Sequence, residues 1–265
     1  MISRIINYIK NNTNSEYIQL KKLSRYPRYS SGNFSFQNGN INFPDSNAFV
    51  FMYREIFKKE IYRFDTENET PLIIDGGANI GLSTIYFKQL YPKAKILAFE
   101  PDKKIFDCLK NNILDFNLAD IELKNIALWN FDGQISFNSE GSDANRIESS
   151  NNDTDFSDTY SVECSKLSNY LKDVKVDFLK LDIEGAEHEV IEEIVPYLDN
   201  IDKIFLEYHS FENRDQDLDK LLQILKNANF RLYINSPVSG RNSPFISEKN
   251  WLGIEYFLNI YAYRN

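Results

Sequence analysis

The chain has 265 residues, of which 42% are hydrophobic, and its formal net charge at pH 7 is −9. This length suits one large domain, or one domain with an appended cap, and the apolar content is enough for a sizeable core. An acidic chain repels phosphate backbones, so the charge disfavours a nucleic-acid substrate.

The cysteine content and the hydropathy pattern bear on where the protein works. The two cysteines, Cys108 and Cys164, indicate a reducing compartment rather than a disulfide framework. No apolar run approaches the roughly 18 residues that a membrane-spanning helix needs, and no signal peptide is visible. We therefore expect a soluble, cytoplasmic protein without a membrane span. The sequence leaves the oligomeric state open.

The first part of the chain is expected to form a helical cap, residues 1–65, ahead of a main domain, residues 66–265. Four isoleucines at helical spacing predict a short helix at the very start. The Asn- and Ser-rich residues 11–45 look irregular, residues 46–58 form a helical pattern, and residues 61–64 are a candidate strand. The aromatic side chains of the cap either fill a core or line an acceptor pocket.

Strands and helices alternate from residue 72 onward. Short apolar runs predict the strands, and apolar residues spaced by three and four predict the helices. The predicted strands are residues 72–74, 96–99, 121–129, 134–137, 176–182, 203–209, 230–234 and 252–263. The predicted helices are residues 82–90, 102–116, 168–172, 189–197 and 214–228. The alternation predicts an α/β fold with a mostly parallel, doubly wound sheet.

Two local features stand out within this pattern. Asp102 is placed to cap the N-terminus of the helix that follows it, because its carboxylate can accept hydrogen bonds from the first free N–H groups. Residues 138–158 are polar, acidic and aperiodic. Segments of that length without secondary structure are usually either lids or disordered, so both interpretations stay open.

The stretch from Pro71 to Asp102 carries the first chemical motif. An apolar run ends at Asp75, and a second apolar run ends at Glu100. The turn after the first run contains Gly76, Gly77, Ala78, Asn79 and Gly81. Glycines let the backbone turn sharply and let a ligand approach the main chain, and the helix start presents free N–H groups and a positive dipole end. An acid at the Glu100 position can accept hydrogen bonds from ribose hydroxyls, so the stretch predicts half of a nucleotide-binding fold.

The spacing within the turn favours one kind of nucleotide. A dinucleotide site usually has the pattern G-x-G-x-x-G, whereas Asn79 places a side chain where that pattern wants none. The order Asp75-x-Gly77-x-Asn79-x-Gly81 resembles the first motif of class I S-adenosylmethionine (SAM) methyltransferases. That resemblance implies that Asp75 faces the methionine end of SAM. The plainer interpretation is a glycine turn that only packs a helix onto a sheet.

Three strings resemble the FkbM family of SAM-dependent methyltransferases. They are DGGANIG at residues 75–81, AFEPD at residues 98–102 and KLDIEGAE at residues 180–187, with EYH at residues 207–209 beyond them. The resemblance covers roughly residues 60–235. It implies a class I (Rossmann-like) sheet of seven strands with an antiparallel last strand, SAM as the cofactor, and methylation of a hydroxyl on a sugar-containing or other natural-product acceptor. The residues implied to bind the cofactor are Asp75, Gly76, Gly77, Ala78, Asn79, Gly81, Glu100, Pro101, Asp102, Ile126 and Ala127.

Asp182, Glu184 and His209 are the candidate catalytic residues. They follow the fourth and fifth predicted core strands, and ligands of such sheets bind beyond the carboxyl ends of the strands. His209 has a pKa range suited to accepting a hydroxyl proton at neutral pH. Each residue also has a structural interpretation: the acids stabilise a helix start, and the histidine bonds to backbone. The three side chains could together hold Mg²⁺, but we predict no required metal.

Other functions compete with this prediction. An NAD-dependent oxidoreductase would share the strand, turn, helix and acid, but Asn79 and the KLDIEGAE string speak against it. An amino-methyltransferase would often carry an N/D-P-P-Y/F string where residues 182–185 read DIEG. A third alternative, a non-catalytic scaffold that binds SAM, is not excluded by the sequence. The acceptor is expected to be a small molecule or a glycan, enclosed by the long loop and by cap aromatics such as Tyr26, Tyr29, Phe34 and Phe36.

Overall fold

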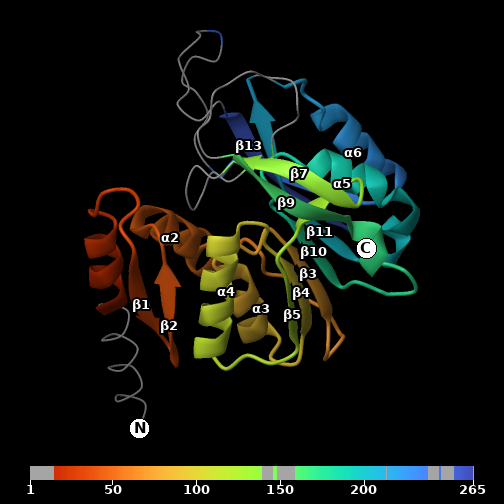
Figure 1. The fold of residues 1–265 in the computed structure, drawn as a ribbon. Coiled ribbons are helices and arrows are strands. Elements are labelled where there is room, and N and C mark those ends of the chain that lie inside the picture. Colours follow the sequence, from red (N-terminus) through yellow and green to blue (C-terminus); the bar gives the residue numbers. More distant parts are fainter. Residues whose placement is uncertain are drawn as a thin grey trace.

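The computed structural model describes residues 15–138, 146–147, 159–212, 214–237, 245 and 254–264. Its centre is a seven-stranded sheet, shown in Figure 1. From one edge to the other the strands are β12 (Arg231–Asn235), β13 (Ile254–Tyr263), β11 (Lys203–Phe211), β10 (Phe178–Leu181), β3 (Leu72–Gly76), β4 (Lys95–Phe99) and β5 (Ile121–Lys124). Strand β13 runs antiparallel to both of its neighbours, and the remaining pairs are parallel. The predicted fold class is therefore confirmed.

Helices cover both faces of the sheet, because successive residues of each buried strand point to opposite sides. Ile73 belongs to the core cluster under α3 (Leu82–Leu90) and α4 (Lys103–Asp115). Its neighbour Ile74 belongs to the cluster under α5 (Glu187–Glu193) and α6 (Leu218–Asn227). Figure 1 shows these two helix pairs on opposite sides of the strands. Within the part of the chain that the structure describes, no helix is both long and apolar enough to span a bilayer.

Two helix boundaries follow from local chemistry. Asp102 caps α4, and its Oδ1 accepts hydrogen bonds from the backbone N–H groups of Lys104 (2.7 Å) and Ile105 (2.9 Å), so the predicted cap is confirmed. The helix predicted over residues 189–197 ends at Glu193 instead. A 3₁₀ turn, Val195–Asn200, follows it with a proline near its start, and proline cannot continue an α-helix.

The prediction of an irregular stretch at residues 11–45 is wrong. Residues 15–23 are helical, and a hairpin follows, made of β1 (Gly32–Phe36) and β2 (Gly39–Phe43). The hairpin has a period-two signal, since its buried Phe34, Ile41 and Phe43 each alternate with polar neighbours. The predicted helix over residues 1–10 and almost all of the predicted 138–158 loop lie outside the described residues.

Aromatic side chains join the cap to the sheet. Helix α2 (Ser46–Tyr53) and a π-helical turn (Arg54–Lys58) bury Phe49 and Tyr53 against Phe34. The same hydrophobic cluster continues through α3 and α4 to the sheet. The strand predicted at residues 61–64 is wrong: Tyr62 lies in a turn and packs edge-on against Phe205 of β11. The division into a cap and a main domain at residue 65 stays a prediction.

The strand predicted at residues 121–129 divides into two strands of different sheets. Strand β5 ends at Lys124, and β6 (Ala127–Trp129) joins a second sheet with β9 (Thr159–Lys166), β7 (Gly133–Asn138) and β8 (Arg146–Ile147). The Asn125 side chain causes the division, because its amide donates to the carbonyls of Glu100 (2.8 Å) and Pro101 (2.9 Å). These bonds draw the chain across the end of β4 toward the site.

Candidate active site

A cavity lies where the cap meets the carboxyl ends of the central strands. This is the edge at which open α/β sheets bind their ligands. The cap side of its lining consists of Phe51, Met52, Glu55, Ile56, Ile61 and Tyr62. The sheet side consists of Gly77, Asn79, Phe99, Glu100, Pro101, Ile126, Ala127, Leu128, Asp182, Ile183, Glu184 and Glu207.

The glycine turn after β3 is held against two neighbouring strands. The N–H groups of Gly77 and Ala78 both donate to the carbonyl of Phe99, at 3.1 and 2.8 Å. Gly77 has φ +76°, and a β-carbon on it would lie 1.8 Å from the backbone oxygen of Asp182. Only glycine fits there, because the turn and the end of β10 touch through their main chains. The turn is thus fixed relative to both walls of the cavity.

Asp75 lies beneath the turn and is fully buried. Its Oδ2 accepts hydrogen bonds from the hydroxyls of Ser83 (2.6 Å) and Thr84 (2.7 Å) in the first turn of α3. The ammonium of Lys180 lies 3.4 Å from Oδ1, which accepts no hydrogen bond from the described residues. Asp75 is not one of the described lining residues, so its expected role toward the methionine end of SAM stays a prediction.

Lys180 is a buried residue beside the site that the sequence pattern alone did not single out. Its side chain is 2% exposed, and its ammonium donates to the carbonyls of Gly76 (3.1 Å) and Gly77 (2.8 Å). It also lies 3.6 Å from the carboxylate of Asp182. Burial opposes the charge of Lys180, but the carboxylates of Asp182 and Asp75 outweigh burial and raise its pKa. This lysine ties the glycine turn to the end of β10, and its place in the KLDIEGAE string was the available signal.

Glu100 directly follows β4 and lines the cavity. One carboxylate oxygen accepts the N–H of Asn79 (3.0 Å), and the other accepts the N–H of Asp102 (2.9 Å). Each oxygen keeps a second lone pair for a ligand hydroxyl. Burial raises the pKa of Glu100 to about 8. The neighbouring Phe99, Leu128 and Ala127 form an apolar surface beside this carboxylate, so the residues present fit a nucleoside with its ribose on Glu100 and its base in the apolar slot.

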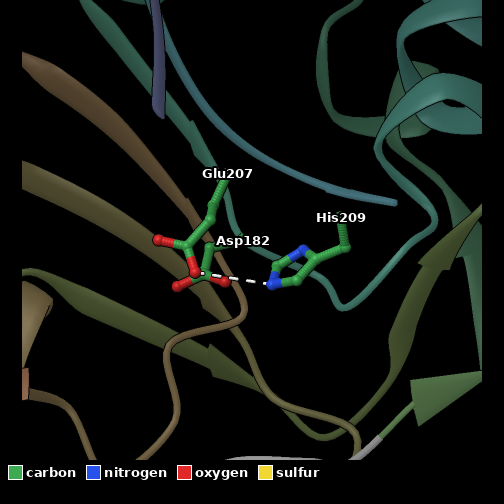
Figure 2. A group of neighbouring side chains, drawn as sticks. All are labelled: Asp182, Glu207 and His209. Atoms are coloured by element: carbon green, nitrogen blue, oxygen red, sulfur yellow. Dashed lines mark ion pairs between the residues drawn. The ribbon is translucent and has the colours of Figure 1, made fainter. Parts of the chain in front are cut away.

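The ends of β10 and β11 bring carboxylates around His209. Figure 2 shows Asp182 and Glu207 side by side, with the imidazole pointing toward them. The His209 Nε2 atom lies 3.4 Å from Glu207 and 3.6 Å from Glu184, and Nδ1 lies 3.4 Å from Glu187. Burial disfavours the imidazolium, but Glu184, Glu187 and Glu207 outweigh burial and raise the pKa of His209 well above its ordinary value. These acids therefore favour the protonated form of His209.

The acids around His209 do not all ionise freely. Burial raises the pKa of Glu184 to about 8, and it also raises the pKa of Glu207. Glu184 has φ +56°, a backbone conformation that is strained for a residue with a side chain and that is often found at functional sites. Ligand atoms of Asp182, Glu207 and His209 lie within 4.8 Å of one another, which is the spacing of a candidate cation site.

The structure brings most of the predicted site residues to one cavity. The predicted residues that line it are Gly77, Asn79, Glu100, Pro101, Ile126, Ala127, Asp182 and Glu184. The predicted residues that are not among the described lining are Asp75, Gly76, Ala78, Gly81, Asp102 and His209. Glu207 was missed, although it lies two residues before His209 on the same face of β11. The cap residues predicted to stack on a sugar also lie elsewhere: Phe34 is buried in the core, and Phe51 and Met52 line the cavity instead.

This fold and this cavity define a class I methyltransferase. Residues 75–232 match the family described as "Methyltransferase FkbM domain". The chain therefore belongs to the FkbM methyltransferase family, and it is a methyltransferase by that membership.

Two relatives and one solved structure illustrate the similarity. Methyltransferase sdnD of Sordaria araneosa is 32% identical over an alignment of 173 positions, and the match covers 53% of this chain and 67% of that protein. The 2-O-methyltransferase NoeI of Sinorhizobium fredii is 28% identical over an alignment of 142 positions, and the match covers 47% of this chain and 58% of that protein. The crystal structure of an FkbM methyltransferase from Methylobacillus flagellatus superposes with a TM-score of 0.52 at 15% identity, covering 78% of this chain and 46% of that chain. This last likeness concerns the fold alone.

Proposed function

We propose that the protein is a SAM-dependent O-methyltransferase whose acceptor is a hydroxyl of a sugar-containing or other natural product. The observation that carries the proposal is that one cavity joins a nucleoside-type slot at Glu100 to a cluster of carboxylates at the ends of β10 and β11. The similarity to a protein named as a 2-O-methyltransferase favours oxygen as the acceptor atom. We also propose a cytoplasmic location, in keeping with the free thiols of Cys108 and Cys164.

SAM, when bound, supplies a methyl group that its sulfonium already activates. Glu100 would hold the ribose, while Ala127 and Leu128 would cover the adenine and Asp182 would lie toward the methionine end. Positioning of the two reactants can contribute roughly 7–11 kcal/mol to such a transfer. A general base contributes a smaller factor, about 10²–10⁴ in rate. The cap wall of Phe51, Met52 and Ile56 would position the acceptor and keep water out.

A carboxylate suits the role of base better than His209 does. The surrounding acids raise the pKa of His209 and so favour its protonated form, which cannot accept a proton. Glu184 lines the cavity and has a pKa of about 8, which suits proton transfer near neutral pH. We therefore propose Glu184 as the group that receives the hydroxyl proton, with His209 as the positive charge that holds Glu184 and Glu207 in place.

Calorimetry with SAM, S-adenosylhomocysteine and NAD tests the cofactor assignment. We expect saturable binding of the first two ligands and none of NAD. Saturable NAD binding without SAM binding would favour an oxidoreductase. Mass-balance detection of methyl transfer from SAM to extracted glycans and lipids then identifies the acceptor. A chain that binds SAM and methylates nothing in that panel would favour the scaffold interpretation.

Affinity for S-adenosylhomocysteine should rise with pH in a way that depends on Glu100. The acid has a pKa of about 8, so below that pH it is protonated and a weaker acceptor for ribose hydroxyls. Between pH 9 and pH 7 we expect a loss of up to about 10-fold in affinity. Glu100→Gln should bind weakly at both pH values, with a cost near 10- to 150-fold at pH 9. Any titration of the ligand itself affects the wild type and the variant equally. If the variant shows the same pH dependence of affinity as the wild type, Glu100 does not bind the ribose.

Turnover should increase with pH toward a plateau above about 8, because Glu184 must lose its proton to act as a base. Glu184→Gln is expected to lower kcat by about 10²- to 10⁴-fold with nearly unchanged affinity for S-adenosylhomocysteine. His209→Asn removes the charge that favours ionised Glu184, so its pH–rate profile should move to higher pH. If the turnover of His209→Asn does not depend on pH at all, instead of depending on it at a higher pH, the base is His209.

Removal of divalent metals is expected to leave methyl transfer intact. Asp182 already faces the ammonium of Lys180, and the acids around His209 favour its protonated form, which competes with metal binding. Excess EDTA should therefore not change kcat. Loss of activity in EDTA that Mg²⁺ restores would place a required cation on Asp182, Glu207 and His209.

A further inference from the structure

The cap contributes a buried phenol to the wall of the cavity. Tyr62 is 3% exposed and lies in a turn in which the N–H of Arg63 donates to the carbonyl of Glu60 (2.9 Å). The Tyr62 side chain lines the cavity, and its hydroxyl makes no hydrogen bond to any residue that the structure describes. A buried hydroxyl without a partner is costly. A ligand in the cavity that accepts its proton would remove this cost.

Three contacts fix the orientation of the phenol ring. Phe205 of β11 packs edge-on against it, with 4.8 Å between ring centroids, and Phe87 of α3 packs at a tilt, at 5.9 Å. The ammonium of Lys180 lies 5.6 Å from the ring centroid. The same ammonium donates to the Gly77 carbonyl (2.8 Å) and lies 3.6 Å from the Asp182 carboxylate. The phenol therefore stands beside the glycine turn and the end of β10.

This position corresponds to one end of the proposed cofactor. By the function proposed above, the adenine lies at β6, the ribose lies on Glu100 after β4, and Asp182 after β10 lies toward the methionine end. Strand β3 lies between β4 and β10 in the sheet. The amino-acid tail of SAM would therefore cross the glycine turn after β3 and end near Asp182 and Tyr62.

The two charges of this amino-acid tail need opposite partners. Asp182 suits the ammonium, whereas the carboxylate needs donors. The described lining contains no lysine or arginine, and Tyr62 carries its only hydroxyl. The lining amide, Asn79, lies on the ribose side, where its N–H donates to Glu100. Burial, with smaller contributions from Asp182 and Glu207, raises the pKa of Tyr62 well above its ordinary value, so the hydroxyl keeps its proton and remains a donor.

We propose that the Tyr62 hydroxyl donates a hydrogen bond to the carboxylate of the cofactor's amino-acid tail. This inference rests on the proposed function and adds to it a cofactor-binding residue in the cap. Tyr62 lies outside residues 75–232, which match the family, so the family motifs do not assign it. The contact also joins the cap to the sheet through the ligand, because the tail is held by Asp182 from one side and by Tyr62 from the other.

Calorimetry of the full chain with two ligands tests this contact. One ligand is S-adenosylhomocysteine, and the other is its amine analogue, which lacks only the carboxylate. Tyr62→Phe should bind S-adenosylhomocysteine at least about 10-fold more weakly than the wild type does, which is the size of one hydrogen bond to a charged group. It should bind the amine analogue as tightly as the wild type does. Tyr91→Phe is the matched control, because the Tyr91 hydroxyl donates to the Phe64 carbonyl (2.7 Å) and Tyr91 is not among the described lining residues.

Urea denaturation without ligand separates a binding role from a structural one. Tyr62→Phe should keep the free energy of unfolding of the wild type, because the hydroxyl has no partner in the free protein. A fall in stability that accompanies the fall in affinity would make the hydroxyl structural and overturn the inference.

The affinities give the remaining outcomes. Unchanged affinity of Tyr62→Phe for S-adenosylhomocysteine overturns the inference, and so does an equal loss for both ligands, which would place the hydroxyl against another part of the ligand. In both cases the wild type still binds S-adenosylhomocysteine, so the proposed function stands. If the wild type binds neither ligand, the proposed function fails together with the inference.

Discussion

Replacing Gly77 with alanine is expected to abolish binding of S-adenosylhomocysteine and to destabilise the fold. The new β-carbon would lie 1.8 Å from the backbone oxygen of Asp182, and both atoms belong to main chains that other bonds fix in place. A positive φ with a side chain costs about 1–2 kcal/mol, and overpacking typically adds about 1–3 kcal/mol. We therefore expect a loss of about 2–5 kcal/mol in the free energy of unfolding.

Gly133→Ala is the matched control for Gly77→Ala. Gly133 also has a positive φ, +157°, but a β-carbon on it would meet only side-chain atoms of Phe131, at 3.4 Å. Urea denaturation measures stability, and calorimetry measures ligand affinity. The control should lose only the backbone cost of its positive φ, about 1–2 kcal/mol, without the added cost of a main-chain clash, and it should keep normal affinity. Equal behaviour of the two variants would mean that the contact between the turn and β10 has no special importance for the site.

Replacing Lys180 with methionine should cost about 3–5 kcal/mol of stability, because it leaves a buried carboxylate without its cation. Asp75 is fully buried and would keep only the hydroxyls of Ser83 and Thr84. The carbonyls of Gly76 and Gly77 would lose their shared donor as well. The glycine turn would then be held less firmly, so affinity for S-adenosylhomocysteine should fall together with stability.

Lys175→Met provides the comparison for Lys180→Met on the protein surface. Lys175 is 71% exposed and pairs with Asp202 at 3.2 Å. Exposed ion pairs contribute about 0–1 kcal/mol, so this variant should unfold at nearly the same urea concentration as the wild type. If Lys180→Met also unfolds at the urea concentration of the wild type, the buried ammonium is not what stabilises Asp75 and the turn.

The sheet was predictable because each core strand carries a complete local signal. Buried parallel strands appear as short apolar runs, and the acids that end them, Asp75, Glu100 and Asp182, mark the edge where ligands bind. The hairpin β1–β2 was missed although Phe34 and Ile41 carry a period-two pattern, because the polar residues between them suggested a loop. Strand β9 was also missed, although Tyr160, Val162 and Cys164 alternate with polar residues there; its pairing with β6 and β7 depends on segments distant in sequence.

The sequence predicted which residues lie at the candidate site better than it predicted what each of them does. Sequence spacing brought Glu100, Asp182, Glu184 and His209 to one edge of the sheet, where the structure also has them. It could not reveal that His209 is enclosed by carboxylates, since Glu187 reaches it from the next helix. Nor could it reveal Lys180 as the residue joining turn and strand, because that depends on burial in three dimensions. Roles that arise from burial and from shared charges can be recognised only in the three-dimensional structure.

The two faces of α2 set a limit on how this enzyme can be redesigned. Phe49 and Tyr53 on one side belong to the hydrophobic cluster that continues into the sheet, whereas Phe51 on the other side is 46% exposed and lines the cavity. Transplanting a whole cap from a relative would exchange the cavity lining and part of the hydrophobic core at once. Directed evolution of acceptor preference is better confined to Phe51, Met52 and Glu55, where libraries can vary the lining while the shared aromatic framework is inherited intact.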